Sequence, residues 1–359
     1  MIEFILKITF LIWPFGQLLR FNVFGFNLYL LDLFTFFLLF VLVFKKGKTS
    51  VKNPIFKPLI IFLSVTSLSL VMAKPHLSSM QFLTAFLYLA RLWSYPSIFF
   101  ALQFVDYAKL KTSLIFSFTI FTLIGLGQYV FRPNMTDLKF LGFDDHYYRL
   151  IGSLFDPNFS GLVFSVLTLF LLTQKKWILA VITLISLALT FSRASYLTLI
   201  FGLLIFYLFK RPKIVLIGIL TLSLFIFLIP KPFGEGVNLF RTFSIFSRLD
   251  SLKAGVGLFM QKPILGWGYN TLTNLNGNRI GIDNSFVYIM ATSGALGFLS
   301  FLNLIFVLFR YTSSSAINKL LTLVLFHSLF NNSFFFIWIN TLFWLLAGLS
   351  KNLRQEINA

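Results

Sequence analysis

Long apolar stretches run along most of the chain, and short polar or charged segments separate them. Each stretch approaches the roughly 20 residues that an α-helix needs to cross the hydrocarbon core of a bilayer. The apolar residues follow one another continuously, without the alternation typical of membrane β-strands, so a β-barrel is excluded. The pattern predicts twelve transmembrane helices, at residues 2–19, 28–44, 56–73, 82–103, 112–131, 158–174, 177–191, 194–209, 214–229, 285–309, 318–330 and 333–350. We therefore expect an all-α integral membrane protein, with residues 1–359 forming a single multi-pass domain.

The charged residues between these stretches predict how the chain crosses the membrane. Counted from the N-terminus, every second loop and the C-terminal tail are basic, and the first of them, 45–57, holds five lysines. The short loops between them carry three basic residues, Arg20, Lys74 and Arg193. Because cytoplasmic loops are enriched in Lys and Arg, we expect both termini to be cytoplasmic. The two long loops, 132–157 and 230–284, then lie outside, and we expect them to form the active-site face.

The composition excludes several classes of protein. Hydrophobic residues make up 58% of the chain and charged residues only 11%, and the mean hydropathy is +0.87. A soluble domain carries about 25% charged residues, so a soluble globular enzyme is excluded. The sequence contains no cysteine, which excludes disulfides, zinc–thiolate sites and a cysteine nucleophile.

The charge imbalance indicates lipid partners rather than nucleic acid. The chain has 30 Lys and Arg residues against 11 Asp and Glu, which gives a formal net charge of +19. On a membrane protein this excess indicates positive cytoplasmic loops and contact with anionic lipids. The sequence also lacks a Gly-rich phosphate loop, and ATP lies on the side of the membrane opposite the two long loops. We therefore expect membrane lipids and an already activated substrate as partners, and no nucleic acid.

The first long outer loop ends in the sequence RLIGSLFDPN at 149–158. Asp156 followed by a proline is typical of a helix start, because Asp caps the N-terminus and Pro suits the first turn. The positive end of that helix dipole would face outside, where it attracts anions. Arg149 and Asn158 are therefore candidate substrate-binding residues, and so is His146 upstream. The alternatives are simple capping for Asp156 and a surface role for Arg149 and His146.

A short hairpin carries the sequence TFSRAS at 190–195. The 33 residues from 177 to 209 must supply two helices and a turn. With about three residues in the turn, each helix has about 15 residues and a length of about 22 Å, against about 30 Å of hydrocarbon. Arg193 at the tip would then lie below the outer surface, where an ionisable residue is a functional candidate. The alternative is that Arg193 reaches up to the lipid headgroups.

The second long outer loop contains an amphipathic segment at 241–260. Apolar residues recur in it at helical spacing, at Leu249, Leu252, Val256 and Phe259. Arg241 and Arg248 are two helical turns apart and share one side if the helix extends as far as Arg241. We expect a helix on the outer membrane face that presents both arginines, followed by a turn at Gly266-Trp267-Gly268. The alternative is that these cations contact lipid phosphate only.

The tenth predicted span begins after Asp283-Asn284, at another outward-facing helix start. Asp283 is a candidate catalytic base, with simple helix capping as the alternative. Arg279 and Asn284 are candidate substrate-binding residues beside it. The outer face thus combines arginines, helix starts and a carboxylate. Because Arg forks match phosphate oxygens, this combination predicts a polyanionic lipid headgroup as the substrate.

Other ionisable residues are less suited to chemistry. Asp32, Arg91 and His327 lie within predicted spans, and we expect pairing or burial inside the helix bundle rather than catalysis. The carboxylates of Asp144, Asp145 and Asp156 are oxygen ligands of the kind that divalent ions take, but their spacing matches no known metal loop. We therefore predict no metal and no cofactor.

Four segments together resemble the O-antigen ligase and polymerase family. They are RLIGSLFDPN at 149–158, TFSRAS at 190–195, RLDSLKAGVGLFMQKPILGWGYNTL at 248–272, and Asp283-Asn284 followed by Gly294 and Gly297. They occur in the family's order and on the predicted outer side of the membrane. The twelve predicted spans, with a long outer loop before the tenth, also resemble the family.

The resemblance implies a helical membrane glycosyltransferase of the GT-C type in the bacterial inner membrane, with its active site on the periplasmic face. Such a protein takes a glycan from undecaprenyl pyrophosphate, within a polysaccharide export pathway, and joins it to a sugar acceptor without a nucleotide sugar or a metal. Carried over by motif, Arg193 and Arg248 would bind the pyrophosphate. Asp283 would take the proton of the attacking hydroxyl, and direct displacement would invert the anomeric centre.

The family's ligases have His where this chain has Asp283. This difference favours a polymerase that joins lipid-linked repeat units, as in O-antigen lipopolysaccharide. A ligase that transfers the glycan to lipid A-core or another acceptor is the first alternative. A lipid-linked glycan transporter, or flippase, is the second; such transporters often have two matching six-span halves, which this sequence lacks. A structural scaffold would leave the outer arginines unexplained.

Overall fold

Helices form most of the molecule. The computed structural model describes residues 1–23, 25–106, 108–230, 234–272, 280–312 and 315–358, and 75% of it is helical. The α-helices are α1 (Ile2–Ile12), α2 (Leu30–Val51), α3 (Phe56–Ala73), α4 (Ser79–Ser94), α5 (Ser97–Leu102), α6 (Ala108–Phe131), α7 (Pro157–Thr173), α8 (Trp177–Leu189), α9 (Arg193–Tyr207), α10 (Pro212–Leu228), α11 (Phe243–Gln261), α12 (Ser285–Tyr311), α13 (Ser315–His327) and α14 (Ile337–Asn358).

Short elements connect these helices. Two antiparallel hairpins pair β1 (Arg20–Val23) with β2 (Phe26–Tyr29), and β3 (Asn134–Met135) with β4 (His146–Tyr147). In the first hairpin Arg20 lies opposite Tyr29. The 3₁₀ segments are η1 (Trp13–Leu19), η2 (Lys74–His76), η3 (Thr136–Leu141), η4 (Gly152–Leu154) and η5 (Glu235–Val237).

The long apolar helices confirm an all-α membrane protein. In the described chain, five helical segments are long and apolar enough to cross a bilayer: Ile2–Leu19, Phe56–His76, Ser79–Leu102, Ala108–Phe131 and Ser285–Tyr311. A helix covers most of every other predicted stretch as well. Six of these helices have only 10–17 residues within the described chain, and 13 residues of helix rise about 20 Å. The count of twelve spans therefore stays a prediction.

The stretch predicted as one helix at 82–103 is two helices, α4 and α5, in the structure. The helix starts earlier than predicted because Ser78 and Gln81 form a capping box. It is interrupted at Pro96, whose ring nitrogen cannot donate a helix hydrogen bond.

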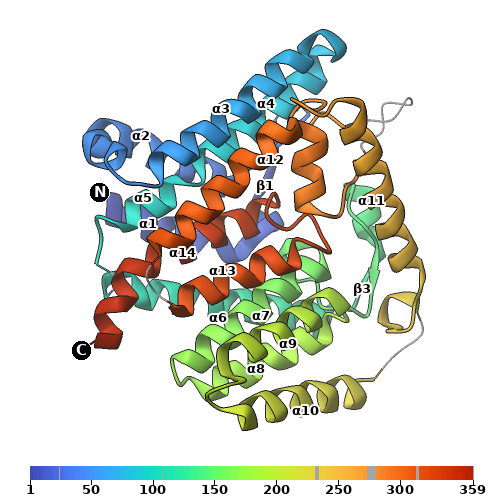
Figure 1. The fold of residues 1–359 in the computed structure, drawn as a ribbon. Helices are drawn as coiled ribbons and strands as arrows, with labels where there is room; N and C mark the ends of the chain where they lie inside the picture. The colour runs from blue at the N-terminus through green and yellow to red at the C-terminus, as the bar shows by residue number, and fades with distance from the viewer. Residues whose placement is uncertain (24, 107, 231–233, 273–279, 313–314, 359) are drawn as a thin grey trace.

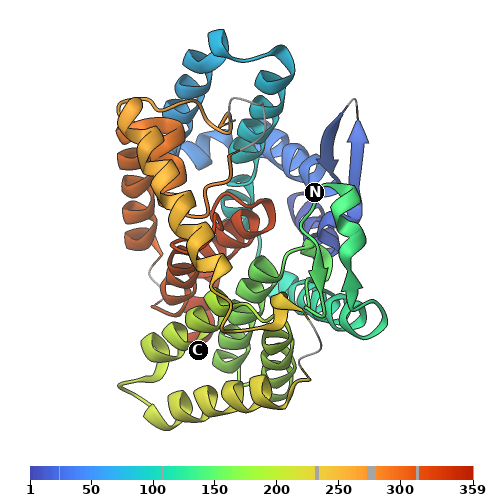
Figure 2. The same cartoon turned by 90° about the vertical axis from the view of Figure 1, so that its right-hand side faces the viewer.

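The parts of the two long loops that the structure describes gather at one end of the molecule. α11 and β3 lie at the right of Figure 1, whereas both chain termini lie at the left. Figure 2 looks onto the right-hand side and shows α11 crossing in front of the helices behind it. The predicted amphipathic segment 241–260 forms a helix from Phe243 onward, and this helix lies at the end of the molecule opposite the termini. Arg241 precedes the helix, so the expectation that α11 presents both Arg241 and Arg248 on one side is wrong.

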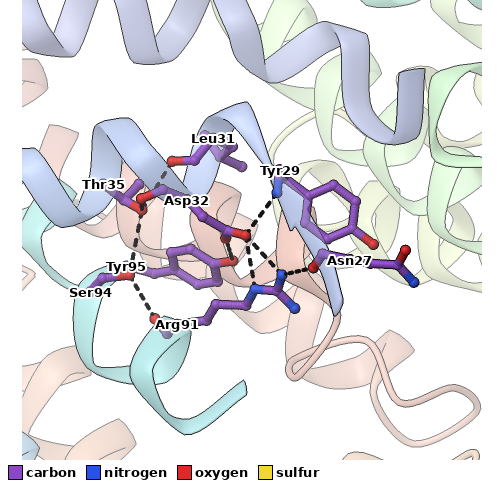
Figure 3. A network of polar contacts seen from close by, with 8 residues as sticks. All are labelled: Asn27, Tyr29, Leu31, Asp32, Thr35, Arg91, Ser94 and Tyr95. Atoms are coloured by element: carbon purple, nitrogen blue, oxygen red, sulfur yellow. Dashed lines mark hydrogen bonds and ion pairs between the residues drawn. The ribbon is translucent and has the colours of Figure 1, made fainter. Parts of the chain in front are cut away.

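A buried ion pair joins α2 to α4 (Figure 3). Asp32 and Arg91 are 1% and 3% exposed, and an Arg91 Nη2 to Asp32 Oδ2 distance of 2.8 Å closes the pair. Tyr95 Oη donates to the other carboxylate oxygen at 2.7 Å, and the Tyr29 backbone N–H donates to Oδ2 at 3.0 Å. Arg91 also donates to the Asn27 carbonyl. The expected pairing of Asp32 and Arg91 inside the bundle is confirmed.

Breaking this pair from one side is expected to destabilise the protein. Arg91→Met leaves the Asp32 carboxylate buried without its cation, which costs about 3–5 kcal/mol. Adding Asp32→Leu removes that uncompensated charge and should recover much of the loss. The measurement is the thermal unfolding midpoint in detergent, with Arg132→Met as the control. Arg132 pairs with Asp137 at the surface, so its loss should cost at most about 1 kcal/mol. Equal midpoints for Arg91→Met and Arg132→Met would contradict the prediction.

α12 is interrupted at Gly294, and the loop that follows α11 fills the gap. Gly294 has a φ of +66°, and a Cβ there would lie 2.2 Å from the Ile264 carbonyl oxygen. Across the interruption the loop supplies main-chain partners: the amides of Ala295 and Leu296 donate to the Pro263 and Ile264 carbonyls, and the amides of Trp267 and Gly268 donate to the Ala291 and Thr292 carbonyls. The loop from Pro263 to Gly268 is thus fixed to α12 through the backbone. The predicted turn at 266–268 is confirmed, since both glycines have a positive φ.

Candidate active site

A cavity of about 420 Å³ lies where four segments from distant parts of the sequence meet. These segments are the start of α9, one side of α11, the residues before α12 and the α13–α14 connection. Its apolar lining consists of Ala194, Leu197, Ile245, Leu249, Leu252, Leu329 and Phe330. Its polar lining consists of Arg193, Arg248, Asp283 and Asn284. The structure therefore brings the three residues predicted to be catalytic to one cavity.

Arg193 is the first residue of α9, directly after a tight turn. α8 and α9 have 13 and 15 residues, and Thr190, Phe191 and Ser192 connect them, so the hairpin is as short as predicted. Phe191 takes a φ of +50°, which reverses the chain within these three residues. The Arg193 guanidinium donates to the Leu239 carbonyl at 3.1 Å and to Ser244 Oγ at 2.6 Å. The turn thus directs Arg193 towards α11.

Asn158 supports this turn from behind. Ser192 Oγ donates to Asn158 Oδ1 at 2.9 Å, and Ser195 Oγ lies 3.0 Å from the Asn158 carbonyl oxygen. The close approach depends on Gly161, because a Cβ there would lie 2.5 Å from Ser195 Oγ. Upstream, the Asp156 carboxylate caps α7, as predicted, by accepting from the backbone of Asn158 at 2.6 Å. Asn158, predicted to bind substrate, holds the turn that carries Arg193 and is not among the residues that line the cavity.

Arg248 lies on the cavity side of α11. Its Nη2 donates to Asn331 Oδ1 at 3.1 Å. Burial lowers the pKa of Arg248, and the nearby Arg193 cation lowers it further, whereas the Asp283 carboxylate opposes both. Two arginines that line one cavity raise the local positive potential, and this potential favours a polyanionic ligand.

Asp283 lies beside Arg248 but does not cap α12. Asn284 is the cap, because its Oδ1 accepts from the backbone N–H groups of Phe286 at 2.9 Å and Val287 at 3.0 Å. The Asp283 backbone N–H donates to Ser251 Oγ of α11 at 2.8 Å. Within the described part of the chain, no side chain donates to the Asp283 carboxylate. Simple capping, the alternative considered for Asp283, is thus wrong.

The protonation of Asp283 depends on two opposed effects. Burial raises the pKa of the Asp283 carboxyl, and this is the largest cause of its shift. The Arg248 cation lowers the pKa, and the Asp144 carboxylate raises it again. The net shift is upward. A carboxylate with a raised pKa is a stronger base than an ordinary surface carboxylate.

Arg149 and Arg241 lie behind the turn rather than among the residues that line the cavity. Arg149 Nε donates to the Thr190 carbonyl at 2.9 Å, and Arg241 Nη2 donates to the Phe191 carbonyl at 3.2 Å. Arg241 also donates to the Gly236 carbonyl at 2.8 Å. Burial, and then the Arg241 cation, lower the pKa of Arg149. Both arginines, predicted to bind substrate, hold the backbone of the turn.

Of the other predicted site residues, some line the cavity and some lie away from it. His146 is buried in β4, away from the cavity lining; burial first, and then the Arg149 cation, lower its pKa to about 3. Asn284 both caps α12 and lines the cavity. Arg279 lies outside the described residues. Across the described ranges, His, Asp and Glu form no group of three that could hold a metal ion.

Sequence reasoning missed the polar residues that orient the arginines. Ser244 and Asn331 each accept a hydrogen bond from a cavity arginine, and Ser251 holds the backbone of Asp283. One signal was available: the polar run Asn331-Asn332-Ser333 interrupts an otherwise apolar stretch between two predicted spans on the outer side.

Residues 178–302 match the family model described as O-antigen ligase. This match supports the O-antigen ligase and polymerase family that the motifs indicated. Members of this family transfer glycosyl groups. The matched residues run from α8 to α12 and include the cavity residues of α9 and α11 together with Asp283. No curated protein matches the chain.

Proposed function

We propose that the protein polymerises undecaprenyl-pyrophosphate-linked oligosaccharide repeat units of a surface polysaccharide at the outer face of the bacterial inner membrane. One observation carries the proposal: two arginines and a carboxylate from separate segments line one mostly apolar cavity of about 420 Å³. Arginine forks match the oxygens of a pyrophosphate. The apolar wall formed by α9 and α11 suits the adjoining prenyl chain.

In this proposal, Arg193 and Arg248 bind the pyrophosphate that leaves the anomeric carbon. Negative charge grows on the bridging oxygen as the bond between that oxygen and the sugar breaks. Donors fixed in place before the reaction stabilise this charge without reorganising, and each such donor contributes about 2.7–4 kcal/mol in other enzymes. The contacts of Arg193 with Ser244 and of Arg248 with Asn331 provide this preorganisation.

Asp283 acts as the base. Its carboxylate takes the proton of the acceptor hydroxyl while that oxygen forms a bond to the anomeric carbon, and the pyrophosphate leaves from the opposite side. A single displacement of this kind inverts the anomeric centre. The raised pKa of Asp283 supports this role, because a base works best when its pKa approaches the working pH. The proposal requires neither a metal nor a cofactor.

The orientation in the membrane follows the loop charges. The basic loops and both termini lie in the cytoplasm. α11 and the cavity belong to the opposite end of the molecule, on the periplasmic side. This arrangement is consistent with the positions of the termini and of α11 in Figure 1. Cytoplasmic ATP is then out of reach, and the energy for glycosyl transfer comes from the lipid pyrophosphate of the donor.

A ligase is the second candidate, because the matching family model is described as O-antigen ligase. It would use the same donor and the same arginines but transfer the finished glycan to lipid A-core or another acceptor. Polymerase and ligase therefore differ in the acceptor that reaches Asp283.

Deletion of the gene, followed by gel analysis of surface polysaccharide and of lipid-linked glycans, tests the proposal. Single repeat units in place of a ladder of polymer lengths are expected, and the full-length chain should restore the ladder. Full-length lipid-linked polymer that is not transferred would instead assign a ligase. Lipid-linked repeats retained on the cytoplasmic side would assign a transporter. An unchanged ladder would reject all three functions.

A further inference from the structure

A chain of buried polar side chains connects Arg248 to the turn that carries Arg193. Arg248 donates to Asn331 Oδ1 at 3.1 Å, and Asn331 Nδ2 lies 3.4 Å from His327 Nε2. The same His327 nitrogen lies 3.2 Å from Ser195 Oγ in α9. Ser195 Oγ in turn lies 2.9 Å from the oxygen of Ser192, the residue before Arg193. His327 is 0% exposed and does not line the cavity.

The chemistry of Arg248 determines the direction of these hydrogen bonds. A guanidinium only donates, so the Asn331 side chain must turn its oxygen towards Arg248 and its NH₂ group towards His327. His327 Nε2 must then accept, and it carries no proton. The proton lies on Nδ1, which donates to Ser333 Oγ at 2.6 Å. A doubly protonated ring would place a donor against the Asn331 NH₂ group. The geometry therefore requires a neutral His327 with its proton on Nδ1.

We propose that His327 is a positioning residue for the glycosyl transfer inferred above: in this tautomer it fixes Asn331, and through Asn331 the direction of the Arg248 guanidinium. In this tautomer Nε2 also accepts a hydrogen bond from the Ser195 hydroxyl, so the same ring is tied to the turn that carries Arg193. The two arginines belong to α9 and α11, which lie far apart in the sequence. One buried imidazole thus holds both at a constant separation. His327 itself does not touch the substrate.

The positioning role of His327 rests on the proposed function only for the ligand that Arg248 binds. The hydrogen bonds of His327 do not depend on that function. The competing explanation is that His327 merely fills the core between α9 and α13. If His327 only fills the core, all polar substitutions of similar size should have the same effect on the site. A positioning residue should distinguish them, because the two ring nitrogens have different partners.

Two substitutions of His327 separate the two sides of the ring. In His327→Gln the side-chain amide reaches the place of Nε2, where it can accept from Asn331. In His327→Asn the shorter amide reaches only the place of Nδ1, so the contact with Ser333 is kept and the contact with Asn331 is lost. Both variants keep a buried polar side chain, and each is therefore the control for the other. Membrane abundance and the thermal unfolding midpoint verify that both fold.

The first readout needs no ligand. Phenylglyoxal modifies arginine, and mass spectrometry follows the modification rate of Arg248 in the full chain in nanodiscs. We expect His327→Asn to raise this rate at least threefold over wild type, since the guanidinium loses its fixed direction, and His327→Gln to keep the wild-type rate. Asn331→Ala should raise the rate as much as His327→Asn. Equal modification rates in the Asn and Gln variants of His327 would overturn the proposal, whether both are raised or both stay at the wild-type rate.

The second readout is binding of undecaprenyl pyrophosphate in the same nanodiscs. His327→Asn should weaken it about 10-fold, which is the loss expected when one hydrogen bond to a charged group no longer forms, and His327→Gln should restore it. Arg248→Ala sets the scale. If Arg248→Ala binds as wild type, the proposed function is wrong, whatever the modification rates are. If Arg248→Ala loses binding and His327→Asn does not, the proposed function survives and the positioning role of His327 is wrong.

Discussion

Replacing Arg193 or Arg248 by alanine should abolish polymer formation while the protein still folds and inserts. Each guanidinium lines the cavity and is held by a neutral partner, Ser244 for Arg193 and Asn331 for Arg248. Removing one such donor costs about 10²–10³-fold in rate in enzymes that stabilise a developing oxyanion. Lysine should restore only part of this rate, because it lacks the planar fork that binds two phosphate oxygens.

The measurement is single-turnover transfer from a lipid-linked donor by purified protein, together with the polysaccharide ladder in cells. Arg132→Ala is the matched control, because Arg132 is an exposed arginine at the start of the first long loop and pairs with Asp137. It should leave the rate within a factor of about two, as surface ion pairs contribute little. A normal ladder in Arg193→Ala or Arg248→Ala, at equal membrane abundance, would remove that residue from the mechanism.

Asp283→Asn should reduce the transfer rate by about 10²–10⁴-fold, because the amide cannot take the hydroxyl proton. Since Asn284 caps α12, neither Asp283→Asn nor Asp283→Ala removes a helix cap. Both variants should therefore unfold at the wild-type temperature. Ser78→Ala, which removes the cap of α4 away from the cavity, is the control: it should lower stability by about 1 kcal/mol and leave the chemical step of the folded fraction intact. A wild-type rate in Asp283→Asn would show that Asp283 is not the base.

If Asp283 is the base, as proposed, it should also give the rate its pH dependence. Burial holds the pKa of Asp283 above the ordinary range of a carboxyl, and a base acts only when deprotonated. The single-turnover rate should therefore fall, as pH falls, already above the range where an exposed carboxyl would be protonated. Arg248 lowers this pKa, so removing its cation should move the acid limb of the residual activity to higher pH. An acid limb that stays in place in Arg248→Ala would contradict this coupling.

Some features of the site follow from segment lengths counted in the sequence, and others depend on contacts between residues distant in the sequence. The short α8–α9 hairpin was predictable because two charged loops fix its length. The choice of cap at 283–284 was not, since Asp and Asn cap helices about equally well. That choice depends on Ser251, whose hydroxyl accepts the Asp283 amide from across 32 positions. Spacing within one helix does not reveal such a contact.

The arginines illustrate a second limit of prediction from sequence. Positive charge on an outer face indicates an anionic ligand, and Arg193 and Arg248 line the cavity as that reasoning suggests. Arg149 and Arg241 have the same charge, but they donate to the carbonyls of Thr190 and Phe191. A carbonyl oxygen carries negative partial charge and accepts from a guanidinium as a phosphate does. The sequence contains no mark that separates the two uses, because the turn with its exposed carbonyls exists only in the folded chain.

The backbone contacts between the loop 263–268 and α12 have a mechanical consequence. They fix α11 at its C-terminal end, where the Trp267 indole also donates to the Leu258 carbonyl at 2.9 Å. At the other end, α11 is held by the side-chain contacts of Arg193 and Arg248. Between the two ends, Ser251 accepts from the Asp283 amide, and Arg248 lies 14 residues, or about 21 Å, from the fixed C-terminal end. A tilt of about 10° about that end would displace Arg248 by roughly 4 Å, so the cavity can widen from the arginine end only if the Ser251 contact breaks.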